Sequence, residues 1–256
     1  MEIQQNNYNM NNPFSLLNKT ILVTGASSGL GKRIAIRCSE SGANMIISGR
    51  NEHRMGETFL QLSKDGNHSK IACDLAVRDN IRAFVESLPV LDGIVMDAAI
   101  FDTTIVRHLK EEKMDALFST NTFANILLMQ TLLKKKKIRN GGSVVFISSV
   151  ASTRPYKGNA LYSATKGAIN SFAKVTALEL ATQKIRVNCI HPGIISSGNA
   201  VEKTISLEDL KKENDRIPLG FGKADDIAYA AVYLLSDVAG WITGSDLIVD
   251  GGQSII

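Results

Sequence analysis

The chain has 256 residues, of which 44% are hydrophobic and 21% charged, and its formal net charge is +4. These values fit a globular chain with a full core, built as one large α/β domain or two small ones, and the dispersed, mildly basic charge suits an anionic ligand as well as nucleic acid. Three scattered cysteines, Cys38, Cys73 and Cys189, form no C-x-x-C pair, which argues against a disulfide framework or a zinc site and favours a reducing compartment.

The chain begins with a polar segment. The first 12 residues are rich in Asn and Gln and cannot bury enough apolar surface to offset their ordering entropy. We predict a flexible extension over residues 1–18, with packing against a neighbouring subunit as the alternative. The sequence shows neither a signal-peptide pattern nor an apolar run of about 18 residues, so we expect a cytoplasmic protein with no membrane or nucleic-acid partner.

From residue 19 onward, short apolar runs alternate with longer amphipathic stretches. The runs predict strands at 20–24, 44–48, 70–73, 91–96, 143–148, 185–190 and 246–249. The stretches predict helices at 30–40, 77–88, 113–133, 160–181 and 224–235. This order is typical of parallel βαβ units with helices on both faces of the sheet. We therefore predict one doubly wound Rossmann-type α/β domain over 19–256, with a mostly parallel seven-stranded sheet.

One polar excursion interrupts the alternation at about 194–216. It follows Pro192-Gly193 and contains one short helical stretch near 207–214. An excursion of this length in a compact domain is often a substrate lid, and an ordinary surface insertion is the alternative.

A glycine-rich turn joins the first predicted strand to the first helix. It reads T-G-A-S-S-G-L-G over 24–31, and the residues that we expect to bind a ligand are Gly25, Ser27, Ser28, Gly29, Leu30 and Gly31. Glycines let the backbone approach a pyrophosphate, and the helix N-terminus presents free N–H groups and a positive dipole to it. The spacing is G-x-x-x-G-x-G, and no Gly-Lys-Ser/Thr ends the loop, which excludes a P-loop.

The end of the second strand indicates which dinucleotide binds. It reads Ser48-Gly49-Arg50, without the carboxylate that often binds the ribose 2′-hydroxyl of NAD. Because Arg50 would attract a 2′-phosphate, we expect NADP(H) to be favoured over NAD(H). The alternative is that Arg50 is a solvated loop residue. Asp74, after the third strand, is placed either to bind the adenine amino group or simply to cap its loop.

A tyrosine and a lysine indicate proton-transfer chemistry. Tyr162 and Lys166 lie four residues apart in a predicted helix and therefore share a face. A nearby ammonium stabilises phenolate, so we expect Lys166 to lower the pKa of Tyr162. Ser149 ends the fifth strand, where ligands bind in open parallel sheets. Ser149 can thus face the same crevice as the glycine loop.

In these motifs the sequence resembles the short-chain dehydrogenase/reductase family, in its single-domain branch of about 250 residues. The resemblance covers residues 19–256 and extends to Asp74-Leu75, Asn121, I-S-S at 147–149, Y-S-A-T-K at 162–166, H-P-G at 191–193, D-D-I-A at 225–228 and I-T-G-S-D-L-I-V-D-G-G at 242–252. It implies Tyr162 as the general acid, Lys166 as the ribose ligand that also depresses the Tyr162 pKa, Ser149 as the group that orients the carbonyl, and Asn121 as the holder of a relay water. It also implies that Leu75, Ala98, Pro192, Gly193 and Ile195 contact the cofactor.

One departure from the family pattern follows the fourth strand. The family usually has Asn-Asn-Ala-Gly there, and this chain has Met96-Asp97-Ala98-Ala99. An acid at 97 accepts where an amide also donates, and Ala99 adds a methyl group near the cofactor path. We expect local rearrangement and altered cofactor affinity. No His/Cys/Asp cluster is visible along the sequence, so we expect no metal, and we expect an ordinary loop role for His191.

Several functional alternatives remain at this point. A catalytically silent dinucleotide-binding scaffold would be expected to lose one of the four relay residues, and a sugar-nucleotide epimerase would need a C-terminal domain that the chain is too short to hold. The substrate is a small carbonyl or alcohol, or an acyl group on a carrier protein that Lys134–Lys137 and Arg139 would meet. Those lysines also suit a helix C-terminus, and Gln183 stands where carrier-dependent reductases commonly have Arg. The resemblance further implies a homotetramer, paired through the helices at 113–133 and 160–181 and through the apolar C-terminus.

Overall fold

The computed structural model describes residues 12–196 and 206–256. Its centre is a parallel sheet of seven strands in the order β3-β2-β1-β4-β5-β6-β7. The strands are β1 (Thr20–Thr24), β2 (Asn44–Gly49), β3 (Ser69–Ala72), β4 (Leu91–Met96), β5 (Ile138–Ile147), β6 (Arg186–Pro192) and β7 (Asp246–Val249). The predicted doubly wound fold is confirmed, and all seven predicted strands are present.

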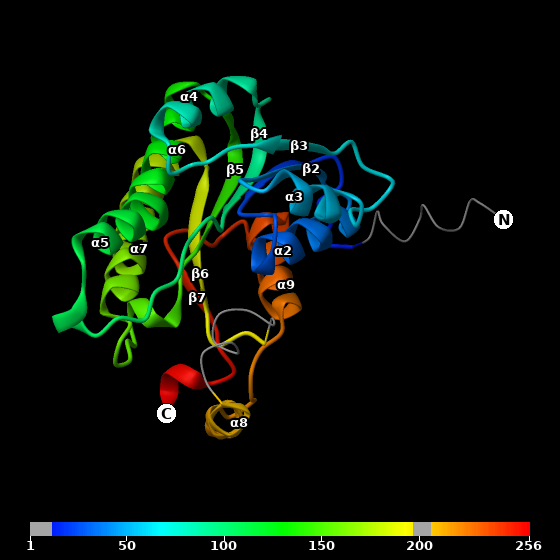
Figure 1. Ribbon diagram of the computed structural model, residues 1–256. Coiled ribbons are helices and arrows are strands. Elements are labelled where there is room, and N and C mark those ends of the chain that lie inside the picture. The colour runs from blue at the N-terminus through cyan, green and yellow to red at the C-terminus, as the bar shows by residue number, and fades with distance from the viewer. Residues whose placement is uncertain (1–11, 197–205) are drawn as a thin grey trace.

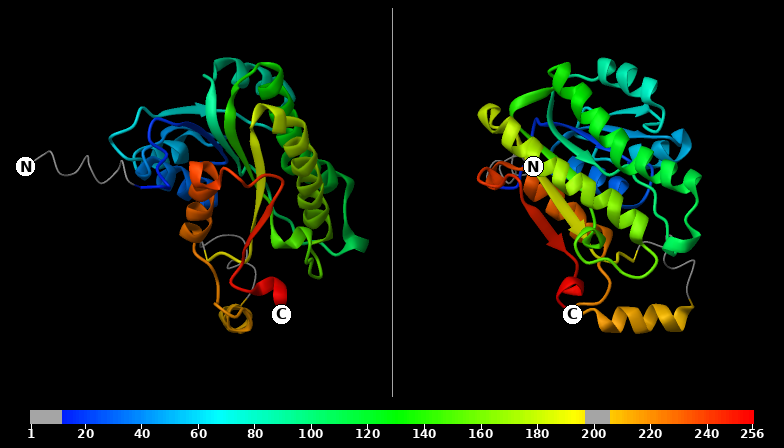
Figure 2. Two further views of the ribbon diagram at one scale, coloured as in Figure 1. Left: turned by 180° about the vertical axis from the view of Figure 1, so that it is seen from behind. Right: turned by 90° about the vertical axis from the view of Figure 1, so that its left-hand side faces the viewer.

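Helices cover both faces of the sheet (Figures 1 and 2). One layer contains α2 (Gly29–Glu40), α3 (Glu52–Phe59) and α9 (Ala224–Leu235), and the other contains α4 (Arg78–Ser87), α5 (Glu111–Leu117), α6 (Ala124–Lys134) and α7 (Ala160–Leu180). Each layer packs on its own core of buried aliphatic side chains. Because both faces are covered, the strands are apolar along their whole length rather than alternating.

Two helical regions differ from the sequence prediction. The stretch predicted as one helix over 113–133 is divided into α5, a π-helical segment at Phe118–Phe123 and α6. Helix α3 was not predicted at all, although its N-cap residue carries a recognisable signal: the Asn51 side chain accepts a hydrogen bond from the Arg54 backbone N–H at 2.9 Å. The short, weakly apolar sequence of α3 concealed it.

The domain begins earlier than residue 19. Leu16 is completely buried, and its backbone N–H donates to the Ser41 carbonyl at 2.8 Å. Leu16 therefore anchors the segment 12–18 to the domain, and the rest of the predicted extension, residues 1–11, lies outside the described residues. No described helix is long and apolar enough to cross a membrane.

The predicted lid is described in part. Ile195 forms a parallel bridge with Gly222, residues 197–205 lie outside the described part of the chain, and α8 occupies Leu207–Arg216. Helix α8 lies apart from the sheet, on the same side of the molecule as the C-terminus (Figure 1). The lid function remains a prediction.

Candidate active site

A cavity of about 460 Å³ opens where the strands of the sheet end, lined by segments that follow β1 to β6. Among the predicted site residues, those in its wall are Gly25, Ser27, Ser28, Gly29, Leu30, Arg50, Asp74, Leu75, Ala98, Ser149, Tyr162, Lys166, Pro192, Gly193 and Ile195. Gly31 and Asn121 lie behind the wall. The fold thus gathers residues that are up to 170 positions apart in the sequence, as expected for the carboxyl ends of parallel strands.

The glycine loop forms one side of the cavity. Gly25 has φ +71°, and a Cβ there would lie 2.9 Å from the Ala98 backbone nitrogen. A Cβ at Gly31 would lie 2.7 Å from the Gly25 carbonyl oxygen. Helix α2 begins at this loop with no acidic residue in its first turn and no side-chain cap from Ser28. The loop can therefore present its backbone and the positive end of a helix to an anion.

Asp97 lies directly beneath this loop. Its carboxylate Oδ2 accepts a hydrogen bond from the Gly31 backbone N–H at 2.8 Å. Burial raises the pKa of Asp97 to about 7, although the charge of Lys166 and the Gly31 hydrogen bond both lower it. The Met96–Ala99 departure therefore places a buried acid of raised pKa in the cavity wall, hydrogen-bonded to the glycine loop.

Two arginines stand at the end of β2. Arg50 was predicted from the sequence, and Arg54 was missed because it belongs to the unpredicted helix α3. Gly49 packs closely against its neighbours: a Cβ there would lie 3.2 Å from the Ser27 Cβ and 3.4 Å from the Met55 sulfur. A carboxylate side chain at position 49 would not fit without movement, whereas two cations border this part of the cavity.

Asp74 uses its polar atoms within its own loop. Its Oδ1 accepts from the Ala76 backbone N–H at 3.0 Å, and its carbonyl accepts from Val77 at 3.2 Å. The loop-capping interpretation is therefore correct for Asp74. The residue still lines the cavity, so contact with a ligand remains compatible with this role.

Tyr162, Lys166 and Ser149 meet in the opposite wall. The Lys166 ammonium lies 5.7 Å from the centroid of the Tyr162 ring and donates to the Ile147 carbonyl at 2.7 Å. The Tyr162 ring also packs edge-on against Phe101, at a centroid separation of 5.0 Å. Ser149 is an N-cap residue whose hydroxyl accepts from the Ala151 backbone N–H at 3.1 Å.

The expectation that Lys166 lowers the pKa of Tyr162 is not met in this structure. Burial raises the Tyr162 pKa above its ordinary value, and the hydrogen bond from Ser149 only partly opposes it, while the charge of Asp97 raises it further. Burial also lowers the pKa of Lys166 to about 8, against the attraction of Asp97. The ammonium faces the ring rather than compensating the phenolate, so desolvation decides the direction for both groups.

Asn121 occupies the π-helical segment and is fully buried. Its side-chain carbonyl accepts from the Ile100 backbone N–H at 2.8 Å, and its amide donates to the Ile100 carbonyl at 2.9 Å and to Thr165 at 3.2 Å. The side chain therefore fixes the segment after β4 to the helix that carries Tyr162 and Lys166. This geometry fits a positioning residue.

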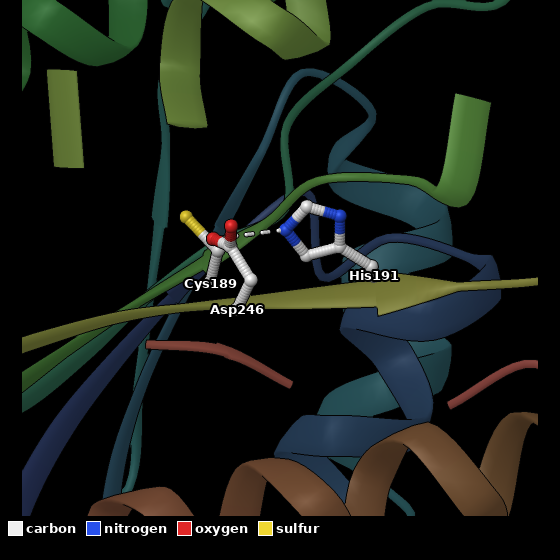
Figure 3. A group of neighbouring side chains, drawn as sticks. All are labelled: Cys189, His191 and Asp246. Atoms are coloured by element: carbon white, nitrogen blue, oxygen red, sulfur yellow. Dashed lines mark ion pairs between the residues drawn. The ribbon is translucent and has the colours of Figure 1, made fainter. Parts of the chain in front are cut away.

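A cluster that the sequence did not reveal lies beside the site, on the α7 face of β6 and β7. Cys189, His191 and Asp246 each contribute one potential ligand atom, and these atoms lie within 4.8 Å of one another (Figure 3). The interpretation that no such cluster exists was wrong, because Asp246 comes from a different strand, in register with Cys189. The loop role expected for His191 is also wrong: the residue belongs to β6 and is completely buried.

Comparison with protein families and curated proteins places this geometry in context. A family model described as enoyl-(acyl carrier protein) reductase matches residues 25–254. A 3-oxoacyl-[acyl-carrier-protein] reductase of Rickettsia conorii is 34% identical over 244 residues, covering 94% of this chain and 99% of the relative. An L-xylulose reductase of Caenorhabditis elegans is 32% identical over 250 residues, covering 94% and 98%.

Solved structures show the same similarity. A short-chain type dehydrogenase/reductase of Mycobacterium ulcerans has a TM-score of 0.86 at 27% identity, covering 94% of this chain and 91% of its own. A protein of Agrobacterium tumefaciens, provisionally assigned as a 2-deoxy-D-gluconate 3-dehydrogenase and solved with bound NADP, has a TM-score of 0.83 at 32% identity and covers 96% of this chain and 100% of its own.

Proposed function

Because the chain belongs to the short-chain dehydrogenase/reductase family, we propose that it is an NADP(H)-dependent oxidoreductase acting on a ketone or the matching secondary alcohol. Tyr162 exchanges the proton that accompanies hydride transfer. The observation that carries this proposal is the convergence of the glycine loop, the arginines after β2 and the Tyr162–Lys166–Ser149 group on one cavity.

The residues of the cavity fit a phosphorylated dinucleotide. Gly25 and Gly31 leave no space for a Cβ, so the loop backbone can approach a diphosphate closely. Arg50 and Arg54 supply positive charge where a 2′-phosphate would lie, and Gly49 provides no carboxylate to bind a free 2′-hydroxyl. The bound NADP in the A. tumefaciens protein supports the same preference.

A nicotinamide cofactor held in this cavity would supply or accept the hydride. Tyr162 is protonated at neutral pH, since the ordinary pKa of tyrosine is about 10 and burial raises it further, so it can donate a proton to the carbonyl oxygen of a ketone. Ser149 orients that oxygen through its hydroxyl. Lys166, buried against the Ile147 carbonyl, binds the nicotinamide ribose, and Asn121 maintains the distance between the segment after β4 and α7.

The basic segment Lys134–Lys137 does not favour a carrier-bound substrate. The segment precedes β5, at the end of the sheet away from the cavity. Lys135 pairs with Glu86 at 2.8 Å, and Lys137 donates to the Leu88 carbonyl, so two of these lysines have local partners. We therefore propose a small ketone, sugar or alcohol substrate. Because the chain is similar to 3-oxoacyl carrier-protein reductases, the assay should also include 3-oxoacyl substrates.

The test is a panel of ketones, sugars, alcohols and 3-oxoacyl substrates, assayed by the absorbance of the reduced nicotinamide. Tyr162→Phe removes only the acidic hydroxyl and should lower turnover by roughly 10²–10⁴-fold, the usual contribution of general acid–base catalysis. Tyr156→Phe is the matched control, because Tyr156 lines the same cavity and is half exposed. Near-full activity of Tyr162→Phe would refute the assignment of the acid. NADPH binding without turnover of any substrate would favour the silent scaffold.

A further inference from the structure

The hydrogen bonds around Ser152 fix the protonation of His191. The Ser152 hydroxyl contacts the Ser149 carbonyl at 2.7 Å, the Asn170 amide nitrogen at 2.8 Å and the His191 Nδ1 at 3.2 Å. The Ser149 carbonyl only accepts and makes the shortest of these contacts, so we assign the single hydroxyl hydrogen to it and treat the other two partners as donors. The proton of a neutral His191 ring therefore lies on Nδ1.

With the proton on Nδ1, the other ring nitrogen, Nε2, has a free lone pair, and this lone pair faces the Asp246 carboxylate. His191 Nε2 lies 3.2 Å from Asp246 Oδ1, which is ion-pair distance if the ring carries a second proton, and neither atom makes a hydrogen bond of regular geometry with any described residue. The His191 side chain is only 1% exposed, so water does not solvate it freely. Two facing acceptors in a buried place are costly unless a cation lies between them.

A third ligand atom completes the arrangement. Cys189 and His191 lie two residues apart in β6 and so point to the same face, and Asp246 is the neighbour of Cys189 in β7 (Figure 3). Sulfur, nitrogen and oxygen thus converge from two strands. This donor set is the one that Zn²⁺ takes in proteins.

We propose that Cys189 Sγ, His191 Nε2 and Asp246 Oδ1 form a zinc site that joins β6 to β7. Nitrogen and oxygen ligands about 2.0–2.1 Å from a tetrahedral zinc are roughly 3.4 Å apart. The observed separation of Nε2 and Oδ1 is 3.2 Å, close to this value, and the three ligand atoms together lie within 4.8 Å of one another, so a side-chain adjustment is needed to bring the sulfur to its bonding distance. Binding forms a zinc–sulfur bond and releases the Cys189 thiol proton to solvent, and water fills the fourth position.

The surroundings supply what a metal site needs beyond its ligands. The ring N–H at Nδ1 donates to Ser152, and Lys174 Nζ holds the second oxygen of Asp246 at 2.8 Å, which leaves Oδ1 for the ion. Such outer contacts orient the ligands of metal sites. The Asp246 side chain is 24% exposed, so an ion can enter beside β7. Ser152 also contacts the Ser149 carbonyl, but the zinc proposal does not rest on the proposed reaction, because its test measures metal binding directly.

The test uses the full chain without an affinity tag, stripped with a chelator and titrated with zinc against a chromophoric competitor. We expect one ion per chain. Co²⁺ should produce the visible bands of a tetrahedral site together with a thiolate charge-transfer band. Cys189→Ala should abolish that band, whereas Cys38→Ala, which removes a buried cysteine in the other core, should retain it.

Two further variants keep the proposal falsifiable if Cys189→Ala does not fold. Asp246→Asn removes a ligand at the accessible edge and should abolish stoichiometric binding. Ser152→Ala keeps all three ligands and should weaken zinc binding by roughly 10- to 100-fold, the usual effect of losing an outer contact. Absence of stoichiometric zinc binding by the wild type would overturn the proposal. It would indicate instead that His191 carries a second proton and forms an ion pair with Asp246. Unchanged binding by Asp246→Asn would overturn it as well.

Discussion

The carboxylate of Asp97 accepts a hydrogen bond from the backbone N–H of Gly31 at 2.8 Å, so an acid lies directly below the loop that we expect to bind a diphosphate. The pKa of this acid is raised to about 7. Above that pH the carboxylate is charged and repels an anionic ligand. Below it the protonated acid is neutral. Cofactor affinity should therefore fall as the pH rises through neutrality.

Asp97→Asn tests this relationship. The amide oxygen can keep the Gly31 hydrogen bond without the charge, so at pH 8 the variant should bind NADPH about tenfold more tightly, the equivalent of one pKa unit. At pH 6, one unit below the pKa of about 7, the two proteins should bind alike. Fluorescence titration measures both values. NADH serves as the control because it shares the diphosphate but lacks the 2′-phosphate, which titrates itself. An equal gain at both pH values would contradict the charge argument.

Arg50→Ala should weaken NADPH binding by about 10- to 100-fold, the cost of a lost charge-assisted hydrogen bond, and should leave NADH binding nearly unchanged. Arg54→Ala should act in the same direction, since Arg54 borders the same part of the cavity. Arg82→Ala, an exposed change on α4, is the matched control. Fluorescence titration with each cofactor measures the preference. Wild-type protein that binds NADH as tightly as NADPH would disprove it.

The sequence was sufficient for the strands and for most of the cavity wall. Long apolar runs mark strands buried on both faces, and strand ends collect ligand-binding residues, so Ser149 could be placed at the crevice. Spacing put Tyr162 and Lys166 on one helix face, and the family resemblance implied that all three share one site. Arg54 could not be placed from the sequence, because the short helix α3 that carries it has too little apolar periodicity. The N-cap residue Asn51 was the remaining sequence signal for this helix.

Tertiary contacts decide what the sequence could not show. The pKa of Tyr162 follows from its burial, which no local pattern encodes. The Cys189–His191–Asp246 cluster depends on the register between β6 and β7, and 53 residues (193–245) lie between these two strands along the chain. The burial of Leu16 could not be predicted either, since it depends on a tertiary contact with the loop at Ser41.

Exposed apolar side chains on α7 support the proposed homotetramer. Val175 is 54% exposed and Leu178 79% exposed, one turn apart on one face. Near the C-terminus, Trp241 is fully exposed and Ile255 82% exposed. Such patches usually mark contacts between subunits. Light scattering should give a tetrameric mass, and Leu178→Glu should reduce it to a smaller species. The matched change Leu60→Glu, at an exposed position after α3, should leave the mass unchanged. A monomeric wild type would refute the prediction.

The direction of the proposed reaction should depend on pH through Tyr162. Oxidation of an alcohol needs the phenolate as base, and burial raises the Tyr162 pKa above its ordinary value, so the oxidative rate should continue to rise with pH beyond 8. Reduction needs the neutral phenol and should persist through neutral pH. Initial rates in both directions, measured with one substrate pair between pH 6 and 10, test this. Tyr156→Phe should keep both profiles, and Tyr162→Phe should abolish the rise. A plateau near pH 8 would contradict this assignment and point instead to Lys166, whose pKa burial lowers to about 8.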